Sequence, residues 1–330
     1  MNGVPIGADK CYGKSELSTR VDENIQIGFG KLPEVNSEPH FEVLRQWLAH
    51  CDYSTSENVK KHSTCQNVSQ RRYSYNLTKK DLPSRLIEVG AKGDTRVYLR
   101  RTKPDNTGKW LALSHRWGPQ PHLCTTVETL EIHLTVGIAF DALPPTFRDA
   151  VTVTRAVGCR YLWIDSLCIV QGEGGDFNEE AKRMPQVYSG AYCVLAASRA
   201  ANHYAGFLHP RQDRDCVALQ QGDQPPFYIC ENIDDFNAHV LESDLNRRGW
   251  VLQEHALARR TVFFTDYQTY FECGEGVRCE TMMTMKKYVG IPCLTPLVAV
   301  WQDALSPNLS RCFPPHLFQP KQSPSTHTLL

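Results

Sequence analysis

The sequence predicts an α/β fold in which a mainly parallel sheet is flanked by helices, with added β-hairpins. Between residues 110 and 200, apolar segments of strand length alternate with helical segments of about 10–15 residues, the order that builds βαβ units. From about residue 216 short strands follow one another closely, which favours hairpins. The 41% hydrophobic content is enough for a core of this kind.

The composition excludes several classes of partner. The 36 basic and 36 acidic residues balance, so no charge excess favours nucleic acid or an anionic membrane surface. No apolar run reaches the roughly 18 residues that cross a bilayer, so we expect no membrane span. The thirteen cysteines are odd in number and scattered. They indicate a reducing compartment, and we expect the protein to be cytoplasmic.

We expect four segments along the chain. Residues 1–38, rich in Gly, Pro, Ser and Asn, form a flexible N-terminal arm. Residues 39–109 form an N-terminal lead-in of a helix plus a hairpin, and residues 110–284 form the main domain. Residues 285–330, rich in Pro, Ser and Gln, form a poorly ordered C-terminal tail.

The lead-in is predicted from its periodicity. Residues 40–51 place apolar side chains at helical spacing and predict a short amphipathic helix. Residues 86–89 and 96–100 predict the two strands of a hairpin. The next strand is predicted at 110–114 and ends in turn residues.

The main domain then alternates helix and strand. A helix begins after Leu143, where proline is accepted in the first turn, and Gly158 is its expected C-terminal cap. The elements expected after it are a buried strand at 161–170, a helix at 176–191, strands at 192–197, 216–219 and 227–230, a helix at 248–257, and a hairpin of 261–264 with 269–273.

One acidic residue, Asp165, stands in the apolar run of 161–170. A buried carboxylate is costly unless it is paired or hydrogen-bonded. Asp165 and Ser166 lie towards the end of the predicted strand that precedes a loop, and ligands of open α/β sheets bind at that end. A ligand-binding acid and a structural acid that caps a turn are both consistent with this position.

The turn of Ser114, His115, Arg116 and Trp117 directly follows a predicted strand. Ser114 and His115 are adjacent in sequence, so their side chains point to opposite faces and do not form a nucleophile pair. A hydroxyl, an imidazole and a guanidinium at the end of a strand favour an anion-binding turn. The alternative is a turn that Trp117 anchors.

Trp250 and Glu254 share one face of the predicted helix, at spacing i and i+4. A carboxylate beside an indole could hold a ribose or another polar ligand. The alternative is a surface glutamate on an amphipathic helix.

Cys51, His62 and Cys65 have partial zinc-ligand spacing, but a structural zinc site needs four ligands. Unrelated loop residues are the favoured interpretation, and we predict no metal. Neither a P-loop nor a G-x-G-x-x-G motif occurs, which argues against nucleotide-triphosphate hydrolysis and Rossmann-type redox chemistry.

These segments together resemble the heterokaryon incompatibility (HET) domain of filamentous fungi. The matching blocks are 111–118 (LALSHRWG), 143–150 (LPPTFRDA), 161–171 (YLWIDSLCIVQ) and 248–254 (RGWVLQE), with Met184, Tyr188 and Ala191 at the positions of a further motif. The resemblance covers roughly residues 110–280.

The resemblance implies a role in non-self recognition that leads to programmed cell death. It also implies a fold distantly similar to the TIR domain, which is flavodoxin-like. Many TIR domains cleave NAD with a Glu four residues after a Trp. By this resemblance NAD or a related nucleotide is a substrate rather than a cofactor. Glu254 and Asp165 are then the catalytic residues, and the ligand-binding residues are Ser114, His115, Arg116, Trp117, Ser166 and Trp250.

Two alternatives stay open. The same fold could act as a non-catalytic module for self-association or for binding a protein partner. The chain could also serve a secondary-metabolite biosynthetic cluster, because HET-domain genes occur in such neighbourhoods.

Overall fold

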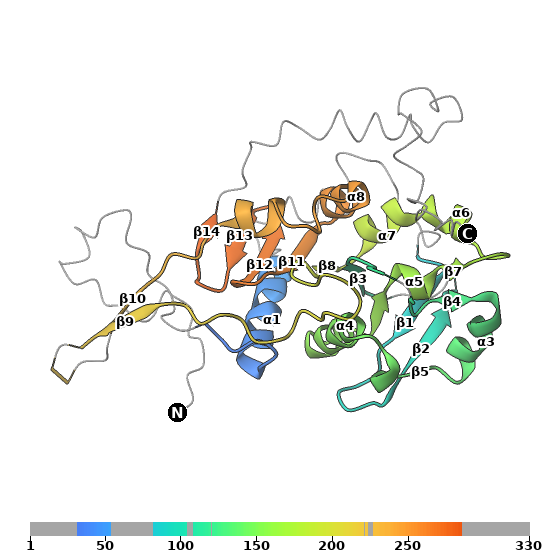
Figure 1. The fold of residues 1–330 in the computed structure, drawn as a ribbon, viewed down its shortest axis with the longest axis horizontal. Coiled ribbons are helices and arrows are strands. Elements are labelled where there is room, and N and C mark those ends of the chain that lie inside the picture. Colours follow the sequence, from blue (N-terminus) through green and yellow to red (C-terminus); the bar gives the residue numbers. More distant parts are fainter. Residues whose placement is uncertain are drawn as a thin grey trace, which may run out of the picture. The chain divides into compact units, whose positions relative to one another are not determined.

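The chain forms a mixed α/β fold around a ten-stranded sheet (Figure 1). The computed structural model describes residues 32–53, 82–103, 108–119, 121–220, 222–223 and 227–285. No helix within these ranges is long and apolar enough to cross a membrane. The helices are α1 (Glu38–Tyr53), α3 (Val127–Thr135), α4 (Pro145–Ala156), α5 (Asp165–Cys168), α6 (Phe177–Ala181), α7 (Met184–Gly190) and α8 (Gly249–Leu257). The strands are β1 (Arg85–Glu88), β2 (Arg96–Arg101), β3 (Trp110–Ser114), β4 (Thr125–Thr126), β5 (Ile138–Ala139), β6 (Tyr161–Trp163), β7 (Val170–Gln171), β8 (Cys193–Ala196), β9 (Cys216–Leu219), β10 (Phe227–Cys230), β11 (Arg260–Phe264), β12 (Thr269–Cys273), β13 (Gly276–Cys279) and β14 (Thr284–Met285).

The large sheet is mixed, and this corrects the prediction of a mainly parallel one. Its order is β14-β13-β12-β11-β8-β3-β6-β1-β2-β5. Only the four central strands, β11, β8, β3 and β6, pair in parallel. The strands on both sides of them pair antiparallel. Consecutive strands form the pairs of β1 with β2 and of β11 through β14, whereas β1 with β6 and β2 with β5 are pairings of strands far apart in the sequence.

The run of residues 161–170 is not one strand, contrary to the prediction. β6 ends at Trp163, and Asp165 begins the single turn of α5. The Asp165 Oδ1 atom accepts the backbone N–H of Ser166 at 2.7 Å. A carboxylate that binds the first N–H groups of a helix favours a helical start over a continued strand. β7 then pairs with β4 in a separate two-stranded sheet.

The predicted helix at 176–191 is two short helices, α6 and α7. Pro185 lies in the first turn of α7. A proline has no N–H to donate, and its ring clashes with the carbonyl four residues earlier, here that of Ala181. The helix therefore breaks between Ala181 and Met184.

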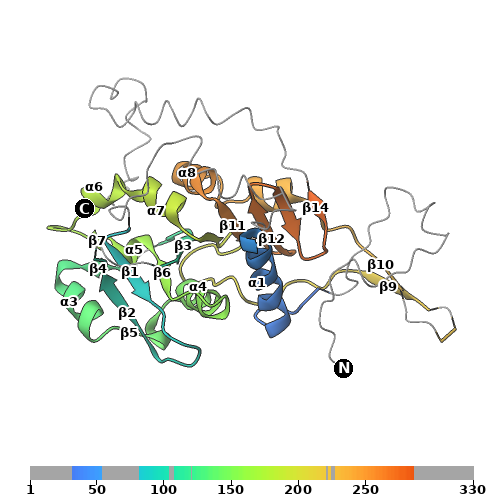
Figure 2. The ribbon, with the colours of Figure 1, turned by 180° about the vertical axis from the view of Figure 1, so that it is seen from behind.

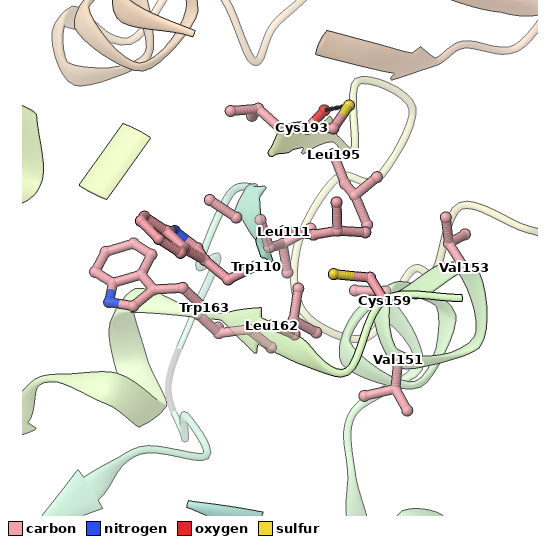
Figure 3. Close-up of a cluster of buried hydrophobic side chains, with 14 of the residues drawn as sticks. Trp110, Leu111, Val151, Val153, Cys159, Leu162, Trp163, Cys193 and Leu195 are labelled. Carbon is pink, nitrogen blue, oxygen red and sulfur yellow. Dashed lines mark hydrogen bonds between the residues drawn. The ribbon is translucent and has the colours of Figure 1, made fainter. Parts of the chain in front are cut away.

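Helices cover both faces of the sheet. Figures 1 and 2 show α1 and α4 on one face and α7 and α8 on the other. Leu111, Leu162 and Leu195 lie on adjacent central strands and pack in one core with Val151 of α4 (Figure 3). Trp163 packs edge-on against Tyr188 of α7, with 5.6 Å between ring centroids. Because neighbouring residues of a strand alternate in direction, each central strand contributes to both layers.

Three elements that precede residue 110, α1, β1 and β2, belong to the same core. β1 pairs with both β2 and β6, so the predicted hairpin exists and extends the central sheet. Trp47 of α1 stacks on Phe271 of β12, with 5.9 Å between centroids. Helix α4 also follows the prediction, with proline in its first turn and Gly158 just beyond its end at φ 73°.

Candidate functional site

The candidate site lies at the carboxyl ends of the central parallel strands. From β3 the chain passes to β6 on one side, and then returns to β8 on the other side of β3. The connections that leave β3 and β8 therefore diverge, and ligands of open α/β sheets bind at such a switch point. Ser114 ends β3 and Asp165 follows β6 by two residues. The amino end of α8 lies at this same edge, since the Arg248 guanidinium donates to the carbonyl of His115 at 2.7 Å.

Ser114 and Glu254 lie next to each other on the α8 side of the sheet. Both are buried, at 2% and 9% exposure. Burial raises the pKa of Glu254 to about 7, and the charge of Asp165 adds to the rise, while Ser114, Arg248 and the Tyr188 hydroxyl oppose it. Neither the Ser114 Oγ atom nor the Glu254 Oε2 atom makes a hydrogen bond of ordinary geometry within the described residues. A buried carboxyl with an unused oxygen is available to a ligand.

Asp165 is held by two donors. Its Oδ2 atom accepts the indole N–H of Trp117 at 2.7 Å, and its Oδ1 atom accepts the N–H of Ser166. Burial raises the pKa of Asp165, and the two hydrogen bonds, together with the charge of Arg248, oppose that rise. The Ser166 hydroxyl is fully buried and has no partner in the described part of the chain. Asp165 therefore joins the turn after β3 to the turn after β6.

Arg248 is the cation of the site, although the sequence did not single it out as a binding residue. It is the residue before the first turn of α8. Its charge lowers the pKa of Asp165, Glu254 and His115, so the guanidinium lies within reach of all three. The available signal was the pair Arg247 and Arg248, which is separated from Trp250 by Gly249 alone.

Three imidazoles gather beside Asp165 on the α4 side. His203 lies 5.0 Å from His115 and 4.9 Å from His122, measured between ring centroids. Burial lowers the pKa of His115 to about 3 and that of His203 to about 4, so both are neutral at pH 7. Ring nitrogens of all three lack a hydrogen-bond partner among the residues described. His203 lies in a loop with no periodic pattern, so no sequence pattern indicated it as a site residue.

The remaining residues predicted for the site are His115, Arg116 and Trp250. His115 packs edge-on against Phe147, on the face opposite Ser114, as adjacent strand residues should. Arg116 donates to the carbonyl of Ala200 at 3.1 Å and pairs with Asp244 at 2.9 Å. Trp250 lies in the first turn of α8, and its side chain lies outside the described part of the structure.

The partial zinc motif is not brought together in the described residues. His62 and Cys65 lie outside them. Cys51 is buried in α1, and its sulfur accepts a hydrogen bond from Arg260 at 3.1 Å.

These features define a class of protein: an α/β domain with a buried, partly unsatisfied acidic site at the switch point of its sheet. Residues 110–254 match the family model described as Heterokaryon incompatibility protein (HET). The match begins at β3 and ends at Glu254, so it spans the residues of the site. No curated protein and no solved structure matches the chain.

Proposed function

We propose that the chain acts in fungal non-self recognition and promotes cell death by hydrolysing NAD at the Ser114–Glu254 site. The observation that carries the proposal is the state of Glu254: buried, with one unused carboxylate oxygen and a pKa of about 7. A general base works best when its pKa is near the working pH, and this carboxyl fulfils that condition.

The reaction would place Glu254 at the ribose. The bond between ribose C1′ and the nicotinamide nitrogen breaks, and nicotinamide leaves as a neutral ring with the bonding electron pair. Ionised Glu254 stabilises the positive charge that develops on the ribose. Water then adds to C1′ and loses a proton to the Glu254 carboxylate. The products are nicotinamide and ADP-ribose.

The neighbours of Glu254 have separate tasks in this proposal. Ser114 lies beside the carboxyl and would bind a ribose hydroxyl. Arg248 supplies the positive charge that a pyrophosphate requires. Asp165, fixed by Trp117 and Ser166, would orient the ribose or a neighbouring side chain.

The test is nicotinamide release by the full chain, followed by chromatography. Glu254→Gln should lower the rate at least about 100-fold, the usual loss when an acid–base group is removed. Glu179→Gln is the matched control, because Glu179 is exposed on α6. The hydrolysis proposal fails if the wild-type chain releases no nicotinamide at high protein concentration, or if Glu254→Gln is as active as the wild type.

Non-catalytic self-association is a second candidate, supported by the ribbon of β9 and β10. Val217, Tyr228 and Ile229 on this ribbon are exposed. Exposed apolar patches mark interaction surfaces more often than single exposed side chains do. If Glu254→Gln still kills fungal cells when overexpressed, assembly rather than hydrolysis is the output. Light scattering of the Val217→Ser, Ile229→Ser double variant against the wild type tests the surface itself.

A further inference from the structure

Two cysteines face each other on the separate ribbon of β9 and β10. The strands pair antiparallel, and Cys216 lies directly opposite Cys230 in the register. Both residues carry thiols. The ribbon belongs to the connection between β8 and α8, away from the core strands.

The hydrogen-bond pattern of the ribbon sets how near these side chains are. Glu231 N–H donates to the carbonyl of Asp215 at 2.7 Å, so those two residues form a hydrogen-bonded pair. Such pairs alternate along an antiparallel ladder with non-hydrogen-bonded ones, in which the Cα atoms are only about 4.5 Å apart. The neighbouring pair, Cys216 with Cys230, is therefore of the closer kind. That separation falls within the range of protein disulfides, about 4.4–6.8 Å.

Both thiols can be reached from solvent. Cys216 is exposed and Cys230 is half-buried. Most of the other described cysteines are buried in the core, and Cys124 is half-buried. The pair is thus distinguished by its exposure as well as by its register.

We propose that Cys216 and Cys230 form a redox-active dithiol that is converted to an internal disulfide by a small-molecule disulfide such as oxidised glutathione. The thiolate of one cysteine attacks a glutathione sulfur and releases one glutathione thiol, which leaves a mixed disulfide. The second cysteine thiolate attacks the protein sulfur of that mixed disulfide and releases the second glutathione. Two electrons pass to the oxidant, and both cysteine protons leave to solvent or to glutathione.

The disulfide would join β9 and β10 covalently. A two-stranded ribbon by itself is only marginally stable in water. A disulfide at its base restricts the open forms of the segment between the two cysteines. The pKa of Cys216 is raised to about 11, first by burial and then by the neighbouring Cys230. The exchange is therefore slow at pH 7 and accelerates as the pH rises, because the thiolate is the nucleophile.

The test uses the full chain, equilibrated with mixtures of oxidised and reduced glutathione at pH 8, then blocked and digested with trypsin. Residues 215–247 contain no internal Lys or Arg, so one peptide carries both cysteines. In the wild type this peptide should become lighter by two hydrogen atoms. It should do so at an oxidised glutathione concentration about tenfold below that which modifies Cys124, because the second exchange step is intramolecular.

Single variants complete the test. In Cys216→Ser and in Cys230→Ser the same peptide should instead gain one glutathione, while Cys124→Ser should leave the internal disulfide unaffected. A wild-type peptide that carries two glutathiones, or that stays reduced when Cys124 is already modified, overturns the proposal. The outcome is independent of NAD hydrolysis, since it is read from the mass of a peptide whose strands form a sheet separate from that of the Ser114–Glu254 site.

Discussion

Glu280 and Glu254 are both buried, but their surroundings differ. Both Glu280 oxygens are used: Oε2 accepts the Thr269 N–H at 2.5 Å and pairs with Arg211, and Oε1 accepts from Arg211 at 3.1 Å. Glu254 is also buried, but its Oε2 atom makes no hydrogen bond of ordinary geometry within the described residues. Burial alone therefore does not distinguish the two carboxyls, whereas the use of their oxygens does, and this difference is the reason why Glu254 is the proposed site residue.

The largest expected effect is on stability at the satisfied glutamate. Glu280→Gln leaves the buried Arg211 guanidinium without its charge partner, since the Arg211 side chain is 7% exposed. Breaking a buried pair costs about 3–5 kcal/mol, and we expect the free energy of unfolding to fall by about 3 kcal/mol. Urea denaturation measures this loss. A fall below about 1 kcal/mol would mean that the Glu280 pair is not structural.

A second prediction concerns how stability depends on pH. The pKa of Glu254 rises from 4.5 in the unfolded chain to about 7 in the folded one, which corresponds to about 3 kcal/mol. Because the folded pKa is the higher one, this stability is fully present below pH 4.5 and is lost as the pH rises to about 7. The difference in unfolding free energy between wild type and Glu254→Gln should therefore shrink over this range and then level off. A difference that stays constant between pH 5 and 8 would contradict the burial of this carboxyl.

A third and smaller effect is expected at Arg248. Arg248→Met removes a charge that lowers the pKa of Glu254, so the rise of NAD hydrolysis with pH should move to higher pH. A rise of one pKa unit lowers the ionised fraction of Glu254 at pH 7 about fivefold, and we expect the proposed hydrolysis to slow by about this factor. Arg247→Met is the matched control, because the Arg247 side chain is 72% exposed. If the two variants have equal pH profiles, Arg248 does not act on Glu254 in the proposed reaction.

The smallest effect is expected at the pair of Arg116 with Asp244. The Asp244 side chain is 59% exposed, and such pairs contribute about 0–1 kcal/mol. Asp244→Asn should change the unfolding free energy by less than about 1 kcal/mol. Arg116→Met distinguishes the two roles of this guanidinium: an increase in the KM for NAD supports phosphate binding, and an unchanged KM leaves only the pair with Asp244.

The local elements of the fold could largely be predicted from the sequence. The strand at 110–114 and the helix after Leu143 follow from an apolar run ended by turn residues and from prolines at a helix start. Two predicted elements, the strand at 161–170 and the helix at 176–191, were wrong because a single residue in each changes the structure that the apolar pattern predicts. Asp165 ends β6 by binding a helical N–H group, and Pro185 divides the helix predicted at 176–191.

The candidate site was predictable in part. Ser114, Asp165 and Glu254 are far apart in sequence and come together only through the strand order, which no local pattern specifies. The antiparallel pairing of β1 with β6 is equally non-local. His203 was not predicted, because its loop has no periodicity. Its place beside His115, with both ring nitrogens lacking a hydrogen-bond partner in the described residues, is visible only in the structure.

The pairing of β1 with β6 has a practical consequence for where this protein can be cut. The family match begins at residue 110 and ends inside α8, before the central strand β11. A fragment limited to that match would lose a central strand and uncover the β6 edge, together with the surface that α1 protects. Unpaired strand edges of this kind promote aggregation. The range of the family match is thus shorter than the range of the packed sheet and core, and expression boundaries should enclose α1 through β14.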